Sequence, residues 1–192
     1  MLTSLAVHDA ISFLLSLLVL SYCMYTIDVI AIVGCFMAVI LPMISKYYTS
    51  NTDYPEIFKR PDGARDCNLF NTGGICDQES GFPSGHVTLI SYFCFYIYSI
   101  YKDSVFENLY GTTDKDEKSN TFSVYLKDLS VFVIFALPII IMGYARYMKK
   151  CHNFVQVLAG AISGYIISKT LVHSQKKIKL ARIRRGEECL LS

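Results

Sequence analysis

The feature that most constrains this chain is a series of five apolar segments, in which the first charged residue is Lys169, near the end of the last segment. Each segment is close to the ~17–25 residues that a helix needs to cross ~30 Å of hydrocarbon. A helix on the surface of a soluble protein shows a polar stripe, and these segments show none. The sequence therefore predicts an all-α, polytopic membrane helical bundle with about five transmembrane helices, at Ala10–Tyr25, Val29–Ser45, Ser84–Tyr101, Leu129–Tyr144 and Phe154–Val172.

Composition narrows the class further. Of the 192 residues, 53% are hydrophobic and 18% are charged, whereas about a quarter of the residues in a soluble domain are charged. A soluble bundle of buried helices is the alternative, but five such segments leave too few polar faces to meet water. The length fits a single domain over residues 1–192. A net charge of +2 argues against a general nucleic-acid binder.

The first apolar segment has the alternative of being a cleaved signal peptide. A signal peptide has a basic region before its apolar core. Here no basic residue precedes the segment, and His8 and Asp9 lie directly before it. We therefore expect a retained helix and five crossings.

Five crossings divide the polar segments between the two sides of the membrane. The first side holds the N-terminus and residues 46–83 and 145–153, and the second holds residues 26–28, the charged loop 102–128 and the basic tail 173–192. Of the 18 lysines and arginines, seven lie on the first side and the other eleven are counted to the second, with Lys169 near that end of the fifth segment included. The positive-inside rule then predicts a cytoplasmic tail, and a first side that faces the lumen or the exterior. We expect the charged loop to be solvated.

The tetrapeptide Pro83-Ser84-Gly85-His86 begins the third segment, on the first side. Proline suits the first turn of a helix, serine is a good N-cap, and glycine lets the backbone approach a ligand closely. Free N–H groups at a helix start bind phosphate. His86 would add a group that transfers protons near neutral pH. A plain helix cap followed by an interfacial histidine is the alternative.

A second group of polar residues, Arg146-x5-His152-x3-Gln156, lies where the fourth segment ends and the fifth begins. His152 and Gln156 are four residues apart and share a helix face, so the amide can orient the imidazole by a hydrogen bond. Gly160 and Gly164 continue at the same spacing, and we expect them to let this helix pack closely against another. An interfacial histidine is the alternative for His152 taken alone.

Arg60-Pro61, preceded by Lys59, adds a third basic group on the first side. The fork of an arginine matches phosphate oxygens, although such a dipeptide alone would be only a flanking charge. The five crossings return it to the membrane face that carries His86 and His152. The sequence therefore predicts an anion site on that face.

Together these residues resemble the pattern of the type-2 phosphatidic acid phosphatase superfamily, which includes lipid phosphate phosphatases, dolichyl diphosphatases, glucose-6-phosphatases and vanadium haloperoxidases. That pattern is K-x6-R-P, then P-S-G-H, then S-R-x5-H-x3-D. The chain keeps this order over about residues 46–164, with a complete P-S-G-H, an R-P at Arg60-Pro61 and an R-x5-H from Arg146 to His152.

Three positions depart from the family pattern. Asp53 stands where the family has its lysine, so Lys46 or Lys59 would have to supply that charge. Ala145 replaces the serine, and Gln156 replaces the final aspartate, as in the H-x3-Q-V of the dolichyl diphosphatase and glucose-6-phosphatase branches. The usual membrane members have six helices, one more than expected here.

The resemblance implies a two-step phosphoryl transfer that needs no metal or other cofactor. His152 would attack phosphorus and form a phosphohistidine, and His86 would protonate the leaving oxygen before water hydrolyses the intermediate. The groups expected to stabilise the phosphate oxygens are Arg60, Arg146, one of the two lysines and the Ser84–Gly85 backbone.

A site at the membrane boundary implies a lipid partner within the bilayer, with its tail among the helices and its phosphate at Arg146. The expected substrate is a lipid phosphate or diphosphate. A lipid phosphotransferase that passes the phosphoryl group to an alcohol is one alternative. A non-catalytic lipid-binding protein is another, favoured by Asp53 and Gln156. A haloperoxidase fits least, because those relatives are soluble.

The cysteines offer a disulfide on the first side. Cys67 and Cys76 flank a short stretch of the 46–83 loop, and a luminal or extracellular location would permit a bond between them. A zinc site built from these two residues with Cys151 and His86 is the alternative, but the spacing matches no usual ligand pattern. We expect the cysteines inside the apolar segments to pack between helices: Cys23, Cys35 and Cys94.

Overall fold

The computed structural model of the chain describes residues 14, 15, 17–19, 21, 22, 25, 28–50, 55–64, 67, 80–110 and 121–185, with side chains described except at 105–110, 121–127 and 182–184. The elements are helices: α2 (Val29–Ser50), the short 3-10 helix η1 (Glu56–Phe58), α3 (Gly85–Tyr110), α4 (Thr121–Met148) and α5 (Phe154–Arg184). Over the described residues, β pairing is limited to one isolated bridge between Lys59 and Ser80. The predicted all-α bundle is confirmed.

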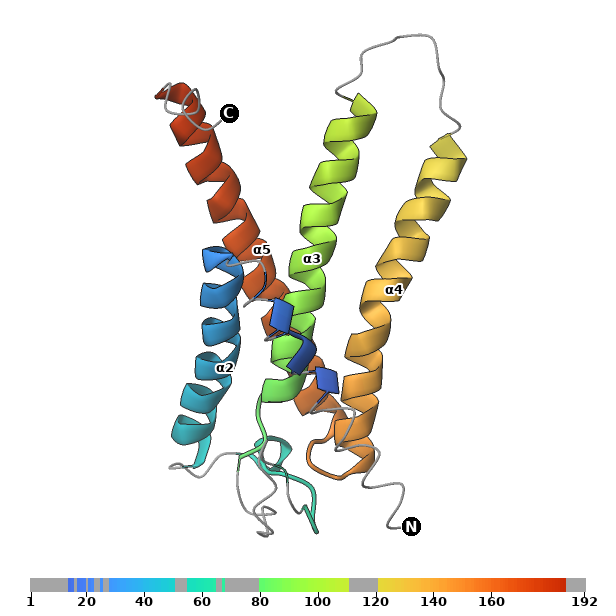
Figure 1. The fold of residues 1–192 in the computed structure, drawn as a ribbon. Helices are drawn as coiled ribbons and strands as arrows, with labels where there is room; N and C mark the ends of the chain where they lie inside the picture. Colours follow the sequence, from blue (N-terminus) through green and yellow to red (C-terminus); the bar gives the residue numbers. More distant parts are fainter. Residues whose placement is uncertain are drawn as a thin grey trace.

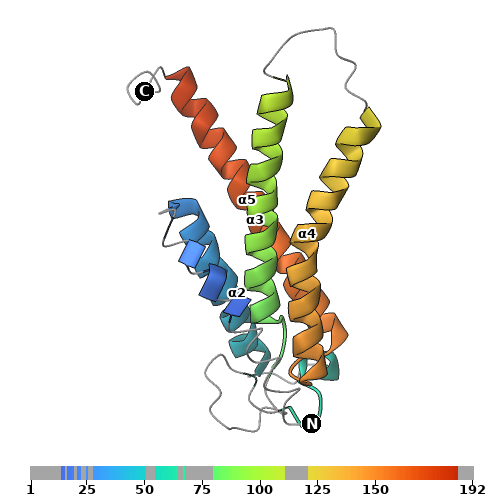
Figure 2. The same ribbon diagram turned by 45° about the vertical axis from the view of Figure 1, so that its right-hand side comes forward.

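The helix α3 is the centre of the bundle (Figure 1). It packs against α2, α4 and α5, and its contact with α5 is the most extensive. The turned view shows α2 and α4 on opposite sides of α3, with α5 crossing behind it (Figure 2). The described residues of the first predicted segment are helical, and they join this core through buried Val19 and an edge-to-face contact of Tyr22 with Phe93.

Within the described residues, three helices are long and apolar enough to cross a membrane: Val29–Ser50, Asp128–Met148 and Phe154–Ala181. They cover the second, fourth and fifth predicted segments. Their outward faces carry exposed apolar side chains such as Phe36, Ile134 and Ile166, which suits a lipid surrounding. The third predicted segment is helical as α3 but is not among the three, and half of the first lies outside the described residues.

Polar side chains explain why α3 is not among these three apolar helices. Its hydroxyl groups donate hydrogen bonds toward α2, α4 and α5, which satisfies polar groups that hydrocarbon cannot solvate. The bonds reach α5, the start of α2 and α4: Ser91 Oγ to Ala161 O at 2.7 Å, Tyr96 Oη to Asp28 Oδ2 at 2.6 Å, and Tyr98 Oη to Asp128 Oδ1 at 2.9 Å.

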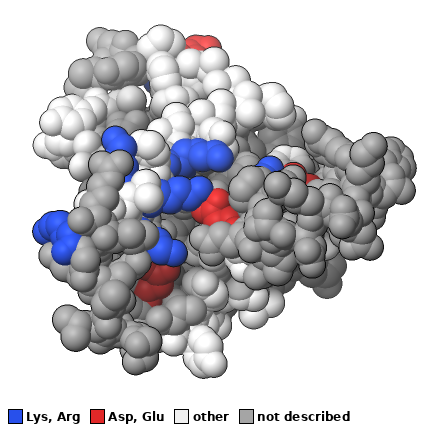
Figure 3. All heavy atoms as spheres, turned by 90° about the horizontal axis from the view of Figure 1, so that it is seen from above, with Lys and Arg blue, Asp and Glu red and all other residues white. Residues whose placement is uncertain are grey.

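The helices continue beyond the predicted segments. The expected 102–128 loop is helical at both ends, because α3 runs to Tyr110 and α4 begins at Thr121, and α5 extends to Arg184 within the predicted tail. Salt bridges support these extensions, with Lys102 Nζ 3.0 Å from Asp128 Oδ2 and Lys176 Nζ 2.7 Å from Asp103 Oδ1. Figure 3 views this end of the bundle, where basic and acidic side chains lie together.

Two glycines let α5 approach the backbone of α3. A Cβ at Gly160 would lie 2.7 Å from Ser84 O, and one at Gly164 would lie 2.5 Å from both Thr88 O and Tyr92 N. Real Cβ atoms do not come so close to backbone atoms, so only glycine fits at either position. The expected role of these glycines in helix packing is confirmed.

We expect Gly164→Ala to destabilise the bundle by about 1–3 kcal/mol, because the new methyl would overlap backbone atoms of α3 that cannot move independently. The matched control is Gly143→Ala on α4, whose Cβ would meet only a Val157 methyl, at 2.8 Å. Thermal unfolding in detergent measures both variants. Equal melting temperatures for Gly164→Ala and the unchanged chain would contradict the close contact.

Candidate active site

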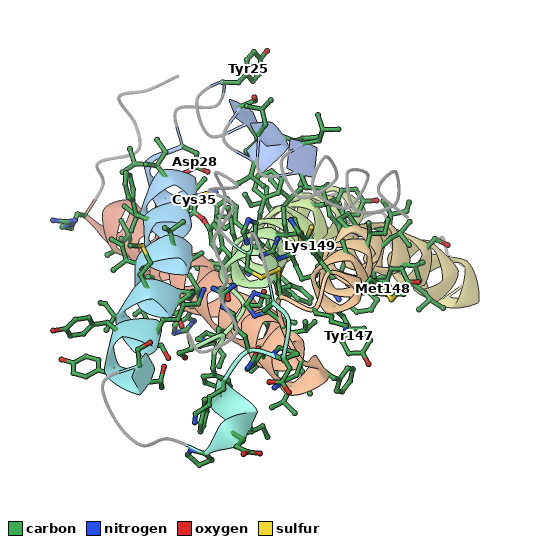
Figure 4. All side chains as sticks on the ribbon, turned by 90° about the horizontal axis from the view of Figure 1, so that it is seen from below. Tyr25, Asp28, Cys35, Tyr147, Met148 and Lys149 are labelled. Carbon is green, nitrogen blue, oxygen red and sulfur yellow. A yellow bond between two sulfur atoms is a disulfide. The ribbon has the colours of Figure 1, made fainter. Side chains whose placement is uncertain are left out.

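The predicted site residues gather at one end of the bundle, where α2, α4 and η1 end and α3 and α5 begin (Figure 1). His86 lies in the first turn of α3, Arg146 in the last turn of α4, and His152 just before α5. Arg60 follows η1. The exposed fractions are 5% for Arg60, 2% for Arg146 and 1% for His152, so three polar side chains are buried together. Figure 4 looks onto this end, with Tyr147 pointing away from the bundle.

His152 is a neutral imidazole among positive charges. Burial is the main cause that lowers the pKa of His152 well below its usual value, and the charges of Arg146, Lys46, Arg60 and His86 lower it further. The ring is therefore neutral at physiological pH, and one ring nitrogen keeps a free lone pair.

The structure distinguishes the two candidate lysines. Lys46, in the last part of α2, is partly buried and acts electrostatically on both His86 and His152. The Lys59 side chain is exposed, and it is the backbone carbonyl of Lys59 that is held within the site. The α2 helix, rather than the segment next to Arg60, thus supplies the lysine charge near the histidines.

A tight turn between α4 and α5 brings His152 next to Arg146. The Cys151 N–H donates to Arg146 O at 3.1 Å, and Lys150 has a φ of 58°, a conformation uncommon outside glycine. The guanidinium of Arg146 in turn donates through Nη2 to Cys67 O. The loop that follows Arg60 is therefore tied to this turn.

A disulfide between Cys67 and Cys151 makes a second connection between the loop and the turn, with the two Cα atoms 5.3 Å apart. The predicted bond between Cys67 and Cys76 is therefore wrong, because Cys67 is already paired; Cys76 lies outside the described residues. The bond also removes both sulfurs as thiolate ligands for the alternative zinc site. Among the described residues there is no group of histidine, cysteine, aspartate and glutamate side chains that could hold a metal ion.

Asn153 and Gln156 cap the start of α5 reciprocally. Asn153 Oδ1 accepts a hydrogen bond from the Gln156 N–H at 2.9 Å, and Gln156 Oε1 accepts one from the Asn153 N–H at 3.2 Å. This is a capping box. Sequence analysis missed Asn153, although an N-x-x-Q spacing at the start of an apolar segment is the pattern that indicates such a cap.

The buried Gln156 side chain also assigns the proton of His152. Its Nε2 donates to Ile57 O at 3.1 Å and to Lys59 O at 2.7 Å, which identifies the amino end of the amide. Its Oε1 lies 3.3 Å from His152 Nδ1. Because an amide oxygen can only accept, Nδ1 carries the proton and Nε2 carries the lone pair.

The first turn of α3 lies against the first turn of α5. The Ser84 N–H donates to the backbone oxygen of Gln156 at 3.1 Å. This backbone N–H, which the resemblance assigned to phosphate binding, therefore already has a hydrogen-bond partner. The Ser84 hydroxyl is fully buried, and no described residue forms a hydrogen bond with it. Because the first N–H groups of a helix have no partner within the helix, the Gly85 N–H and this hydroxyl are among the donors that the start of α3 can offer to a ligand.

A family model described as the PAP2 superfamily matches residues 18–179 of the chain. The matched range includes all the site residues described above. No curated protein and no solved structure matches the chain significantly.

Peptide mapping without reduction should recover a disulfide-linked peptide pair that contains Cys67 and Cys151. Cys67→Ser should lower the free energy of unfolding by about 4 kcal/mol, because a cross-link over 84 residues restricts the unfolded chain. The matched control is Cys94→Ser, which changes a free buried cysteine on α3. Recovery of a Cys67–Cys76 pair would contradict the connectivity.

Proposed function

Because the chain belongs to the PAP2 superfamily, whose members generally are phosphatases, we propose that it hydrolyses a lipid phosphate or diphosphate through a phosphohistidine intermediate. The observation that carries the proposal is the state of His152. Its Nδ1 is held by Gln156, so the lone pair is on Nε2, and three cations act on the ring: Arg146, Lys46 and Arg60. A neutral nucleophile beside positive charges is what attack on a phosphate anion requires.

In the first step, the lone pair of His152 Nε2 forms a bond to phosphorus. The bond between phosphorus and the leaving oxygen breaks, and its electron pair goes to that oxygen, which takes a proton from the His86 imidazolium. Burial, and then the charges of Arg146 and Lys46, disfavour a protonated His86, so the imidazolium would form with the negative substrate bound, whose charge offsets those cations. Arg60, Arg146 and Lys46 stabilise the charge on the remaining phosphate oxygens.

In the second step, a water oxygen attacks phosphorus, and the N–P bond breaks with its electron pair returning to His152 Nε2. The water gives a proton to His86, which restores the imidazolium used in the first step. The sum is the consumption of one water and the release of an alcohol and inorganic phosphate. With a diphosphate, the leaving group is a lipid monophosphate instead of an alcohol.

A lipid substrate is supported by where the site lies. The cations and histidines are at the ends of helices whose outward faces are apolar, so a lipid can keep its tail in the bilayer while its phosphate reaches Arg146. The Cys67–Cys151 disulfide at this end supports an oxidising lumen or exterior as the location of the site. This agrees with a cytoplasmic location for the more basic end of the bundle.

We expect His152→Ala to lower phosphate release at least about a thousandfold, because the variant lacks the nucleophile. His173→Ala, which changes an exposed histidine at the other end of α5, should retain activity. The measurement is phosphate release from a panel of lipid mono- and diphosphates, with an alcohol acceptor present in a parallel series to detect transfer. Full turnover by His152→Ala would refute the assignment of His152 as the nucleophile. If the unchanged chain showed no phosphate release and no transfer to the alcohol, catalysis itself would be refuted.

Lys46→Ala should reduce kcat/KM at least about tenfold more than Lys59→Ala, because a charge-assisted bond to phosphate contributes about 1.5–3 kcal/mol. The two variants remove the same charge from positions that differ in burial. The same assay of phosphate release measures both. A larger loss for Lys59→Ala would reverse the assignment of the lysine.

A further inference from the structure

We infer that the side-chain amides of Asn153 and Gln156 form a clamp that positions Arg60 relative to His152. This amide clamp binds the backbone just before Arg60, and its effect on turnover rests on the proposed function. The two amides are therefore positioning residues, in addition to their role in capping α5.

The clamp consists of three hydrogen bonds to two backbone carbonyls. Ile57 O accepts from Asn153 Nδ2 at 2.9 Å and from Gln156 Nε2 at 3.1 Å. Lys59 O accepts from Gln156 Nε2 at 2.7 Å. The Lys59 carbonyl belongs to the peptide bond that leads into Arg60, so the clamp holds the arginine's own backbone against the start of α5.

Gly81 lies on the other side of the segment that the amide clamp holds. A Cβ at Gly81 would lie 2.4 Å from Gln156 Oε1 and 3.0 Å from Arg60 Cγ. The Gly81 N–H donates to Phe58 O at 2.9 Å, and Lys59 pairs with Ser80 in the isolated bridge. The segment before Arg60 is thus held between α5 and residues 80–81, which accounts for the burial of the arginine.

The chemistry of the clamp requires amides. Backbone carbonyls can only accept hydrogen bonds, and a carboxylate can only accept as well. The aspartate of the family pattern could receive the proton of His152 Nδ1 but could not donate to Ile57 O or Lys59 O. Gln156 does both, because its oxygen faces His152 and its amino group faces the carbonyls. Gln156 is therefore matched to the segment before Arg60 and is not merely a weaker substitute for aspartate.

A double-mutant cycle with Arg60 separates positioning from simple stabilisation of the fold. Asn153→Ser keeps a neutral N-cap oxygen for α5 but shortens the side chain and removes the amide Nδ2 that donates to Ile57 O. It is combined with Arg60→Ala, and the four chains are compared by kcat/KM for phosphate release and by the Kd of inorganic phosphate, measured by calorimetry in detergent. Contacts that act through one another give non-additive losses, and independent contacts give additive ones.

We expect Asn153→Ser to weaken both quantities about tenfold when Arg60 is present and less than twofold when it is alanine. Equal losses in the two backgrounds, or no loss in either, would overturn the clamp. Gly81→Ala is the second, independent variant, since its methyl would press on Gln156 and Arg60; its effect on the Kd of phosphate should show the same dependence on Arg60. Thermal melting identifies the variants that fold, and the cycle is evaluated on those.

The phosphate Kd keeps this test independent of the proposed function. If the unchanged chain binds phosphate but releases none from any lipid phosphate, the proposed hydrolysis fails while the binding cycle still decides the clamp. If the unchanged chain neither binds nor releases phosphate, Arg60 is not an anion ligand and the clamp fails as well.

Discussion

The contact of α5 with α3 at Gly160 and Gly164 is the interaction on which the rest of the site depends. It is a contact between backbones, with Ser84 O and Thr88 O occupying the space of the missing side chains. Because the two helices begin at the same end of the bundle, this contact holds the Ser84 N–H against Gln156 O. The first turns of both helices, and the histidines next to them, are therefore placed by packing deeper in the bundle.

The buried positive charges of the site favour the binding of an anion. Arg60 and Arg146 are almost fully buried, and their charges and that of Lys46 act on His152. Burying like charges together is costly unless an anion compensates them. The loop that carries Arg60 and the turn that follows Arg146 are joined by a disulfide, by the Arg146 bond to Cys67 O and by the bonds of Gln156. Such cross-links hold the cations in place before a substrate arrives, which is the preorganisation that electrostatic catalysis needs.

The helical bundle could be predicted from the sequence because charge-free apolar segments indicate membrane helices. The family could be predicted because its motifs occur in the right order at the ends of those segments. Other features depend on tertiary contacts. The partner of Cys67 is 84 residues away, so proximity in sequence suggested the wrong cysteine. Lys46 and Lys59 could not be distinguished without knowing where α2 ends. The helical ends of the 102–128 segment follow from helices that continue past the apolar layer, supported by Lys102 and Asp128.

The most direct test of the account is the position of the phosphoryl group during turnover. The enzyme would be quenched in alkali, in which phosphohistidine survives, and its peptides would be mapped by mass spectrometry and NMR. Since Gln156 occupies Nδ1 of His152, we predict phosphorylation at Nε2 of that residue. A phosphoryl group on His86, or on Nδ1 of His152, or turnover with no phosphorylated histidine at any quench time, would contradict it.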